Sequence, residues 1–121
     1  MENCIFCKIV NGEIPSKRIY EDDKVIVMMD INPVVDGHVL VIPKEHKTDF
    51  TELDSELLNH IYDVAKKLTP QLLEKLECNS MTFTVNYGDA QVVKHFHLHL
   101  LPNYGKSEAS RSVDEVYEII K

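Results

Sequence analysis

The stretch that decides the fold is His95-Phe96-His97-Leu98-His99-Leu100-Leu101, which Pro102 ends. Successive side chains of an extended strand point to opposite faces, so the three histidines share one face of the predicted strand. Alternate residues lie about 6.6 Å apart, so the imidazoles can line one small anionic group but cannot all chelate one ion. The bland interpretation is a half-buried strand with histidine on its polar face by chance. Half of the chain's six histidines fall within residues 95–99, so chance is a poor explanation. Their spacing suits phosphate chemistry better than a metal site of three histidines.

The segment before the histidine stretch predicts its partner strand. Residues 80–86 alternate between polar and apolar, with Met81, Phe83 and Val85 expected to face a core. Only a short loop, 87–90, separates the two segments. We expect them to form an antiparallel pair.

Three further strands are predicted nearer the N-terminus. The acidic turn Asp22-Asp23 between two apolar runs, 18–21 and 25–30, indicates a hairpin. The second run is continuously apolar and should be a central strand covered on both faces. Residues 38–43 are rich in β-branched residues and end at a proline, as is typical of another strand.

Two helices complete the predicted fold. Asp54 is a candidate N-cap for a long helix, in which Pro70 predicts a kink or a break near residues 67–69. Ser112 and Glu115 form a capping-box pattern before a short last helix, and the polar residues 103–111 should be mobile. The apolar stripe of the long helix comprises Leu57, Ile61, Ala65, Leu68, Leu72 and Leu76. The order predicts an α+β fold with a mostly antiparallel sheet.

Length and charge bound the function. A chain of 121 residues is one domain, 1–121, whose core we expect at about 4–102, followed by a tail with the short helix, 103–121. A net charge of −7 argues against a nucleic-acid surface, because phosphate-backbone binding needs clustered Lys and Arg. No apolar run is long enough to span a membrane and the N-terminus lacks a signal-peptide pattern, so we expect a cytoplasmic protein.

The cysteines leave several interpretations open. Cys4, Cys7 and Cys78 are an odd number, which with no export signal favours reduced thiols or metal ligands over disulfides. A C-x-x-C pair such as Cys4 and Cys7 can supply half of a tetrahedral zinc site, act as a redox pair, or have no function. The redox interpretation normally requires a strand before the pair, and none is predicted.

The histidine stretch resembles the signature of the histidine triad (HIT) family, in which three histidines alternate with apolar residues. Further similarity to the Hint-type branch, in the right order, lies at Ile5-Phe6, Tyr20-Glu21-Asp22, Asp30-Ile31 and 37–44. The resemblance covers about 4–102. It implies an α+β nucleotide-binding domain that pairs as a homodimer through its long helix and a sheet edge. It also implies hydrolysis or transfer at the α-phosphate of a nucleotide through a covalent nucleotidyl-histidine.

The resemblance assigns catalytic roles to four histidines. His97, the middle one, would be the nucleophile, and a neutral imidazole suits this role because its phosphoramidate is itself labile. His99 would donate a hydrogen bond to a phosphate oxygen. His95 would orient the row or bind metal. His38 matches an additional histidine behind the triad, although a histidine at a strand start can also be purely structural.

The resemblance also implies a nucleotide-binding set. Asp30 would accept hydrogen bonds from the ribose hydroxyls, or is simply a turn carboxylate. Asn86 and Gln91 would bind phosphate or leaving group, or are ordinary loop residues. The base would lie in an apolar slot, although Phe6 can equally belong to the core; the slot residues are Ile5, Phe6 and Ile31. Val92 stands where many Hint-type enzymes carry a serine near the leaving group.

Some microbial relatives carry a structural zinc, and this sequence offers a matching set of ligands. Cys4, Cys7, His46 and His95 would give a closed tetrahedral site that serves folding. The alternative is two free thiols, a surface His46, and His95 acting only on the catalytic face.

Our leading hypothesis from the sequence is a purine nucleoside phosphoramidase that releases AMP or GMP. Hydrolysis of dinucleoside polyphosphates by the same His97 is the second enzymatic possibility. A third, of another class, is a nucleotide-binding or protein-interaction module with incidental turnover.

Overall fold

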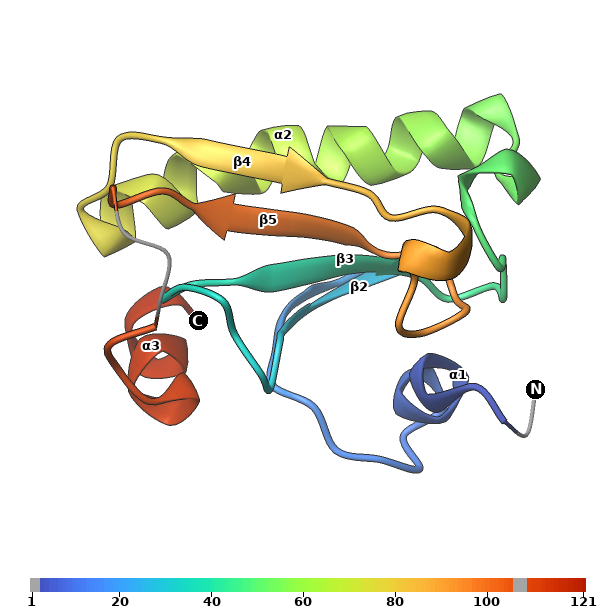
Figure 1. Ribbon diagram of the computed structural model, residues 1–121, viewed down its shortest axis with the longest axis horizontal. Helices are drawn as coiled ribbons and strands as arrows, with labels where there is room; N and C mark the ends of the chain where they lie inside the picture. Colours follow the sequence, from blue (N-terminus) through green and yellow to red (C-terminus); the bar gives the residue numbers. More distant parts are fainter. Residues whose placement is uncertain (1–2, 106–108) are drawn as a thin grey trace.

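The computed structural model describes residues 3–105 and 109–121. Five strands form one sheet in the order β1-β2-β3-β5-β4, and each neighbouring pair is antiparallel (Figure 1). The strands are β1 (Arg18–Glu21), β2 (Val25–Met29), β3 (Val39–Pro43), β4 (Met81–Thr84) and β5 (Leu98–Pro102). The α+β prediction is confirmed, including the hairpin β1–β2 and the pair β4–β5.

Three α-helices and two short 3-10 helices complete the fold. They are α1 (Ile5–Val10), η1 (Phe50–Glu52), α2 (Ser55–Leu76), η2 (Gly88–Ala90) and α3 (Val113–Ile120). Helix α2 is the longest element (Figure 1). Within the described ranges, no helix combines the length and the apolar character needed to cross a bilayer.

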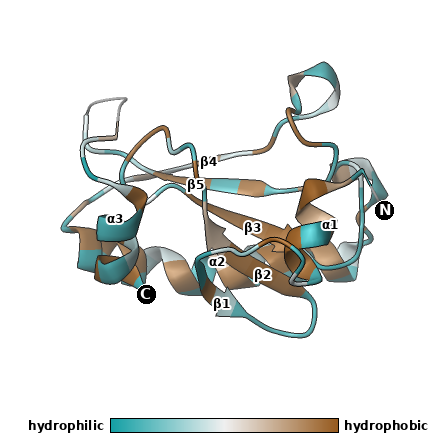
Figure 2. Cartoon of the chain, turned by 90° about the horizontal axis from the view of Figure 1, so that it is seen from below, coloured by the Kyte–Doolittle hydropathy of each residue, from teal (hydrophilic) through white to brown (hydrophobic). Residues whose placement is uncertain are grey.

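Strand β2 divides the interior into two apolar clusters. All five of its residues are buried, as expected for a strand covered on both faces. Val25 and Val27 belong to the main core together with α2 and α3, whereas Ile26 and Met28 pack with α1 on the opposite face. Figure 2 shows the apolar colouring of β2 and β3 between these helices. The short helix α1 is therefore held against the sheet by its own small cluster.

Helix α2 begins as the sequence predicts but does not break. The Asp54 carboxylate accepts the Leu57 N–H at 2.8 Å, and Glu77 ends the helix in the left-handed conformation. The helix is continuous through Pro70, so the predicted alternative of two helices is wrong. Leu68 and Leu72 are buried on either side of the proline. Burying each leucine contributes about 1.5–3 kcal/mol, which is enough together to offset the lost hydrogen bond.

Two local predictions near the histidines and the N-terminus require correction. The strand predicted over the histidine stretch starts only at Leu98. The chain before Leu98 does not pair with β3, because the Phe96 N–H donates to the Lys47 carbonyl at 2.6 Å instead. The C-x-x-C stretch is not predicted to be helical. It instead opens α1, whose N-cap is Cys4.

The prediction that Phe83 faces a core is wrong. Met81 and Val85 pack against the main core, but Phe83 is 47% exposed. It lines a shallow hollow with Tyr62 and Pro70 of α2. The physical reason is that β4 is an edge strand with a neighbouring strand on one side only, so Phe83 is open to solvent on the other side.

The C-terminal segment extends the core beyond residues 4–102. Val116 and Ile120 of α3 are buried in the main cluster, and Ser112 caps the helix by accepting the Glu115 N–H. The predicted mobile segment 103–111 includes 106–108, which lie outside the described residues. At either side of them, Tyr104, Ser110 and Arg111 hydrogen-bond to buried Asp36.

Candidate active site and metal centre

A cavity of about 390 Å³ collects most of the predicted nucleotide-binding residues. Strand β5 and the segment before it supply His97 and His99, and α1 supplies apolar side chains from the other side. Of the predicted set, the cavity is lined by Ile5, Phe6, Asp30, Ile31, Asn86, His97 and His99. Polar groups therefore meet an apolar slot in one cavity, as binding a nucleotide requires.

The main chain fixes the tautomer of His97. Its Nδ1 lies 2.8 Å from the His95 carbonyl, so this nitrogen carries the hydrogen and donates it. The other nitrogen, Nε2, then keeps its lone pair. The ring of Phe6 packs edge-on against the imidazole, with centroids 5.0 Å apart. His97 is thus a neutral, oriented imidazole with an unshared electron pair on Nε2.

His99 holds its hydrogen on the opposite nitrogen. The Val34 N–H donates to His38 Nδ1 at 3.1 Å, so His38 carries its hydrogen on Nε2. That nitrogen lies 2.9 Å from His99 Nδ1, which must accept. His99 Nε2 consequently carries an N–H; it is buried and has no hydrogen-bond partner among the described residues. One imidazole offers a lone pair and its neighbour, 4.8 Å away between ring centroids, offers a donor.

Burial keeps these imidazoles uncharged. Desolvation lowers the pKa of His97 and of His38 below the ordinary value. Desolvation and the neighbouring His97 and His38 lower the pKa of His99 to about 4. Near pH 7 all three rings are therefore neutral, as the hydrogen-bond pattern requires.

The remaining predicted nucleotide ligands fall into two groups. Asp30 lies at the cavity with one carboxylate oxygen accepting the Asn32 N–H and the other 3.4 Å from His38 Nε2. Asn86 also lines the cavity. Gln91 does not: it is buried, and its side-chain amide donates to the Thr48 carbonyl at 2.7 Å.

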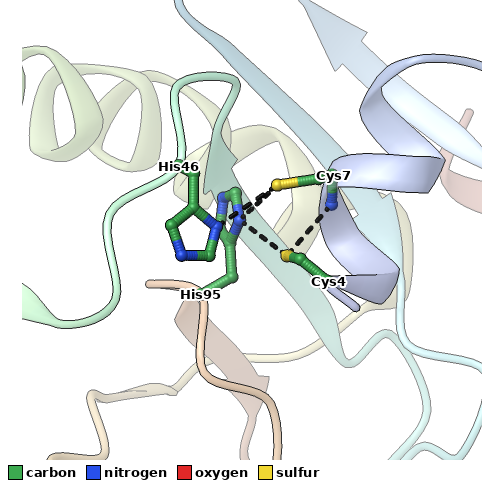
Figure 3. Close-up of side chains that lie close together, drawn as sticks. All are labelled: Cys4, Cys7, His46 and His95. Atoms are coloured by element: carbon green, nitrogen blue, oxygen red, sulfur yellow. Dashed lines mark hydrogen bonds between the residues drawn. The ribbon is translucent and has the colours of Figure 1, made fainter. Parts of the chain in front are cut away.

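The four predicted zinc ligands come together at the start of α1. Figure 3 shows both sulfurs directed toward the two imidazoles. Cys4 Sγ lies 3.2 Å from His95 Nδ1, and Cys7 Sγ lies 3.2 Å from His46 Nδ1. His95 is therefore turned away from the cavity that His97 lines. Of the two roles open from the sequence, the structure favours metal binding for His95.

The chemistry and spacing of this cluster fit zinc. Bonds of about 2.3 Å to sulfur and 2.0 Å to nitrogen in a tetrahedron put sulfur and nitrogen about 3.5 Å apart. The observed distances from Cys7 Sγ to the two Nδ1 atoms are 3.2 and 3.5 Å, and all four ligand atoms lie within 4.8 Å of one another. His95 Nε2 donates to the Pro43 carbonyl at 2.8 Å, which leaves Nδ1 free to coordinate. Four protein ligands leave no open position, so the site suits a structural metal.

Sequence reasoning missed two parts of the site. The Val34 N–H, which sets the tautomers of His38 and His99, is a main-chain donor and leaves no signal in composition. Met28 and Leu40 line the cavity from the sheet. Their alternation with main-core residues on two adjacent strands is the signal that points to them, once the strand order is known.

Comparisons with known proteins agree with this geometry. The family model described as "Scavenger mRNA decapping enzyme C-term binding" matches residues 3–113. An uncharacterized HIT-like protein of Methanocaldococcus jannaschii is 43% identical, over 98% of this chain and 98% of its own. An adenosine 5'-monophosphoramidase of Candida albicans is 40% identical, over 89% of this chain and 74% of its own.

A solved structure of similar fold supports the same relationship. A zinc-bound histidine triad family protein from Mycobacterium smegmatis superimposes with a TM-score of 0.90 at 33% identity, covering 98% of this chain and 91% of that one. The strand order, the placement of the triad and the matches over nearly the whole chain lead to one conclusion. The chain belongs to the histidine triad (HIT) family.

Proposed function

We propose that this protein hydrolyses nucleotides at the α-phosphate through a covalent nucleotidyl-His97, and that it is a purine nucleoside phosphoramidase releasing AMP or GMP. The observation that carries the proposal is the pair of neutral imidazoles with opposite hydrogen placement on one cavity. His97 presents a lone pair and His99 an N–H. The Candida albicans relative, named as an adenosine 5'-monophosphoramidase, supports the choice of substrate class.

In the first step His97 Nε2 attacks phosphorus while the bond to the leaving amine breaks, and the amine takes a proton from solvent. The attacking ring becomes cationic, and its Nδ1–H bond to the His95 carbonyl strengthens as it does so. The His99 N–H donates to a phosphate oxygen on which charge develops. In the second step water attacks phosphorus and releases a proton to solvent, the P–N bond to His97 breaks, and the electron pair returns to Nε2.

The cavity supplies positioning for this reaction. Asp30 has acceptor capacity at the polar end of the cavity for the ribose hydroxyls, and Ile5, Phe6 and Ile31 provide the apolar slot for the base. Zinc held by Cys4, Cys7, His46 and His95 would stabilise the fold beside the cavity and supply no reacting group. The chain's own residues carry out each chemical step.

Trapping the intermediate tests the proposal. A slow substrate carrying label on the α-phosphoryl group should leave that label on His97, located by peptide mass analysis. His97→Ala should lose at least about 10³-fold in kcat while retaining its fold. Label on any other residue, or a His97→Ala variant with near-normal turnover, would contradict the mechanism.

Dinucleoside polyphosphate hydrolysis remains the second candidate, because Val92 removes a hydroxyl expected near the leaving group and is almost fully exposed. Comparing kcat/KM for adenosine 5′-phosphoramidate and for diadenosine polyphosphates separates the two. A nucleotide-binding or protein-interaction role is favoured if His97→Ala abolishes turnover but retains the biological activity.

We also propose that the protein forms a homodimer through β4 and α2. The hollow beside Phe83 is lined by Tyr62, Ala65, Thr69 and Pro70, and both Phe83 and Tyr62 are nearly half-exposed at the open edge of the sheet. Sedimentation should show a dimer for the wild type and a monomer for Phe83→Arg. A wild-type monomer at micromolar concentration would overturn this assignment.

A further inference from the structure

Two of the four predicted metal ligands and one wall of the cavity belong to the same short helix. Cys4 is the N-cap of α1 and Cys7 lies in it. Between them, Ile5 and Phe6 line the cavity. Phe6 packs against a histidine of each site: its ring centroid lies 5.9 Å from that of His95 and 5.0 Å from that of His97. A change at the two sulfurs therefore acts directly on the cavity wall.

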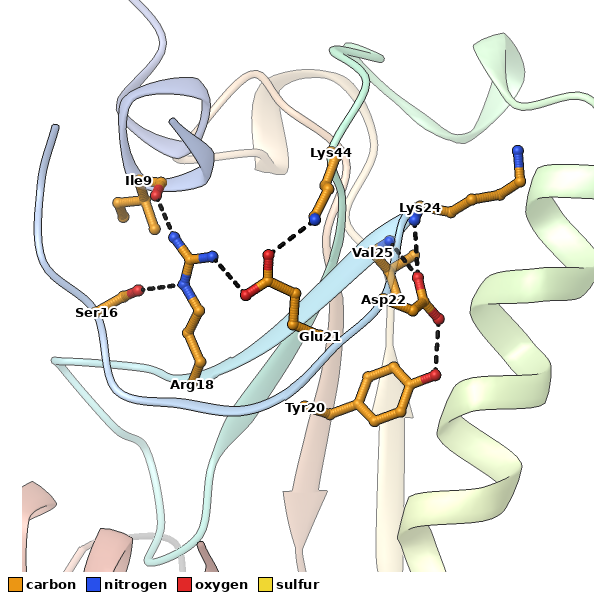
Figure 4. A network of polar contacts seen from close by, with 9 residues as sticks. All are labelled: Ile9, Ser16, Arg18, Tyr20, Glu21, Asp22, Lys24, Val25 and Lys44. Carbon is orange, nitrogen blue, oxygen red and sulfur yellow. Dashed lines mark hydrogen bonds and ion pairs between the residues drawn. The ribbon is translucent and has the colours of Figure 1, made fainter. Parts of the chain in front are cut away.

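Two other kinds of contact among the described residues hold α1 in place. A six-residue helix is not stable on its own, so tertiary contacts must position it. Besides the cluster, these are the burial of Phe6 and Ile9 on the sheet and the Arg18 guanidinium, which donates to the Ile9 carbonyl (Figure 4). The Arg18 contact lies at the C-terminal end of the helix. The N-terminal end, which carries the wall residues, is held by the burial of Phe6 and by the cysteine–histidine cluster.

The cluster borders a second cavity, although Cys4 itself is buried. Cys7 is only partly buried, and this cavity of about 480 Å³ is lined by Cys4 and His46 together with Asn3, Thr48 and Val92. The two sulfurs are neighbours, since the Cys7 N–H lies 3.3 Å from Cys4 Sγ and all ligand atoms are within 4.8 Å. Cys78 lies elsewhere, with its thiol directed to the Asn103 carbonyl.

We propose that Cys4 and Cys7 form a thiol–disulfide site through which a peroxide controls nucleotide affinity; the affinity effect rests on the proposed function. The two sulfurs lose two electrons and form one S–S bond. Hydrogen peroxide accepts these electrons and two protons, giving two molecules of water. A disulfide sulfur is no longer a thiolate ligand, so zinc leaves and His46 and His95 are released. The N-terminal end of α1 then loses one of its two attachments, and Phe6 no longer closes the cavity.

The test uses full-length, zinc-loaded protein titrated with hydrogen peroxide. We expect release of one zinc per chain to a chromogenic chelator and a fall in titratable thiols from three to one. Peptide mass analysis should find Cys4 and Cys7 joined, with the loss of two hydrogens. The Kd for AMP should rise at least about tenfold, and dithiothreitol with zinc should reverse every change.

Controls separate this inference from the proposed function. The Cys78→Ser variant keeps the pair and should respond as the wild type does, whereas Cys7→Ser cannot form the disulfide. Hydrogen exchange over residues 5–10 reports on α1 without any nucleotide and should speed up on oxidation. If reduced protein fails to bind AMP, the proposed function fails, and exchange still decides whether oxidation releases α1. Zinc release with unchanged exchange in α1, or peroxide that leaves the pair reduced, overturns the inference.

Discussion

Replacing His38 tests the tautomer assignment on which the chemistry depends. His38→Phe keeps a ring of similar shape but removes the acceptor for the Val34 N–H and the donor to His99 Nδ1, which lie 3.1 and 2.9 Å from the imidazole. An unsatisfied buried polar group costs about 1–3 kcal/mol, and the Val34 end can recover water. Only the His99 end then stays unsatisfied, so we expect a loss of about 1–3 kcal/mol in the free energy of unfolding.

The expected effect on rate is smaller than the loss of the nucleophile. Without His38, His99 is free to move its hydrogen to Nδ1, and the donor to the phosphate oxygen is lost for part of the molecules. A neutral hydrogen bond contributes about 1 kcal/mol, and removing a complete oxyanion donor costs about 10²–10³-fold. We expect kcat to fall by about 10–100-fold, between these limits.

His38→Gln is the matched variant. A glutamine side-chain nitrogen can occupy the place of imidazole Nε2 and still donate to His99, so kcat should stay within about fivefold of wild type. Urea unfolding gives the stabilities, and single-turnover kinetics with adenosine 5′-phosphoramidate gives the chemical step. A folded His38→Phe with wild-type kcat, or His38→Gln as slow as His38→Phe, would refute the assignment.

Three other predictions address stability, pH and metal. In urea unfolding, Gly37→Ala should lower the free energy of unfolding by about 2–5 kcal/mol, because the φ of +86° is unfavourable for alanine and the added Cβ would lie 2.6 Å from Leu76 Cδ1. The control is Gly12→Ala, which has a φ of +81° but open space around it and should lose only about 1–2 kcal/mol. Burial holds the pKa of His97 below its ordinary 6.5 and that of His99 at about 4, whereas the unfolded chain takes up these protons near pH 6.5. Both kcat/KM and the free energy of unfolding should therefore be constant above pH 6.5 and should fall as the pH drops from 6.5 toward 4. A stopped-flow pH profile in which kcat/KM already falls above pH 6.5 would contradict this. Protein purified without chelator should contain about one equivalent of zinc by metal analysis, and less than about a tenth of an equivalent would reject the site. Removing the metal with EDTA should lower the free energy of unfolding more than it lowers kcat.

The sequence predicts those features that local periodicity specifies. The alternation indicates correctly that His97 and His99 lie on the same side, and the apolar run of β2 indicates a strand buried on both sides. It does not predict that His95 turns to the cysteines, because that depends on contacts with a segment 88 to 91 residues away. Phe83 follows the apolar pattern of a core residue, yet alternation does not distinguish an edge strand from a central one.

The position of α1 in the chain has a consequence for biosynthesis. Cys7 leaves the ribosome early, but its partners His46 and His95 follow 39 and 88 residues later. Helix α1 can therefore reach its final place only after residues that are synthesised much later have emerged. Until His95 has emerged both cysteines remain open to stray metals and oxidants, and capture of the correct ion has to wait for that residue.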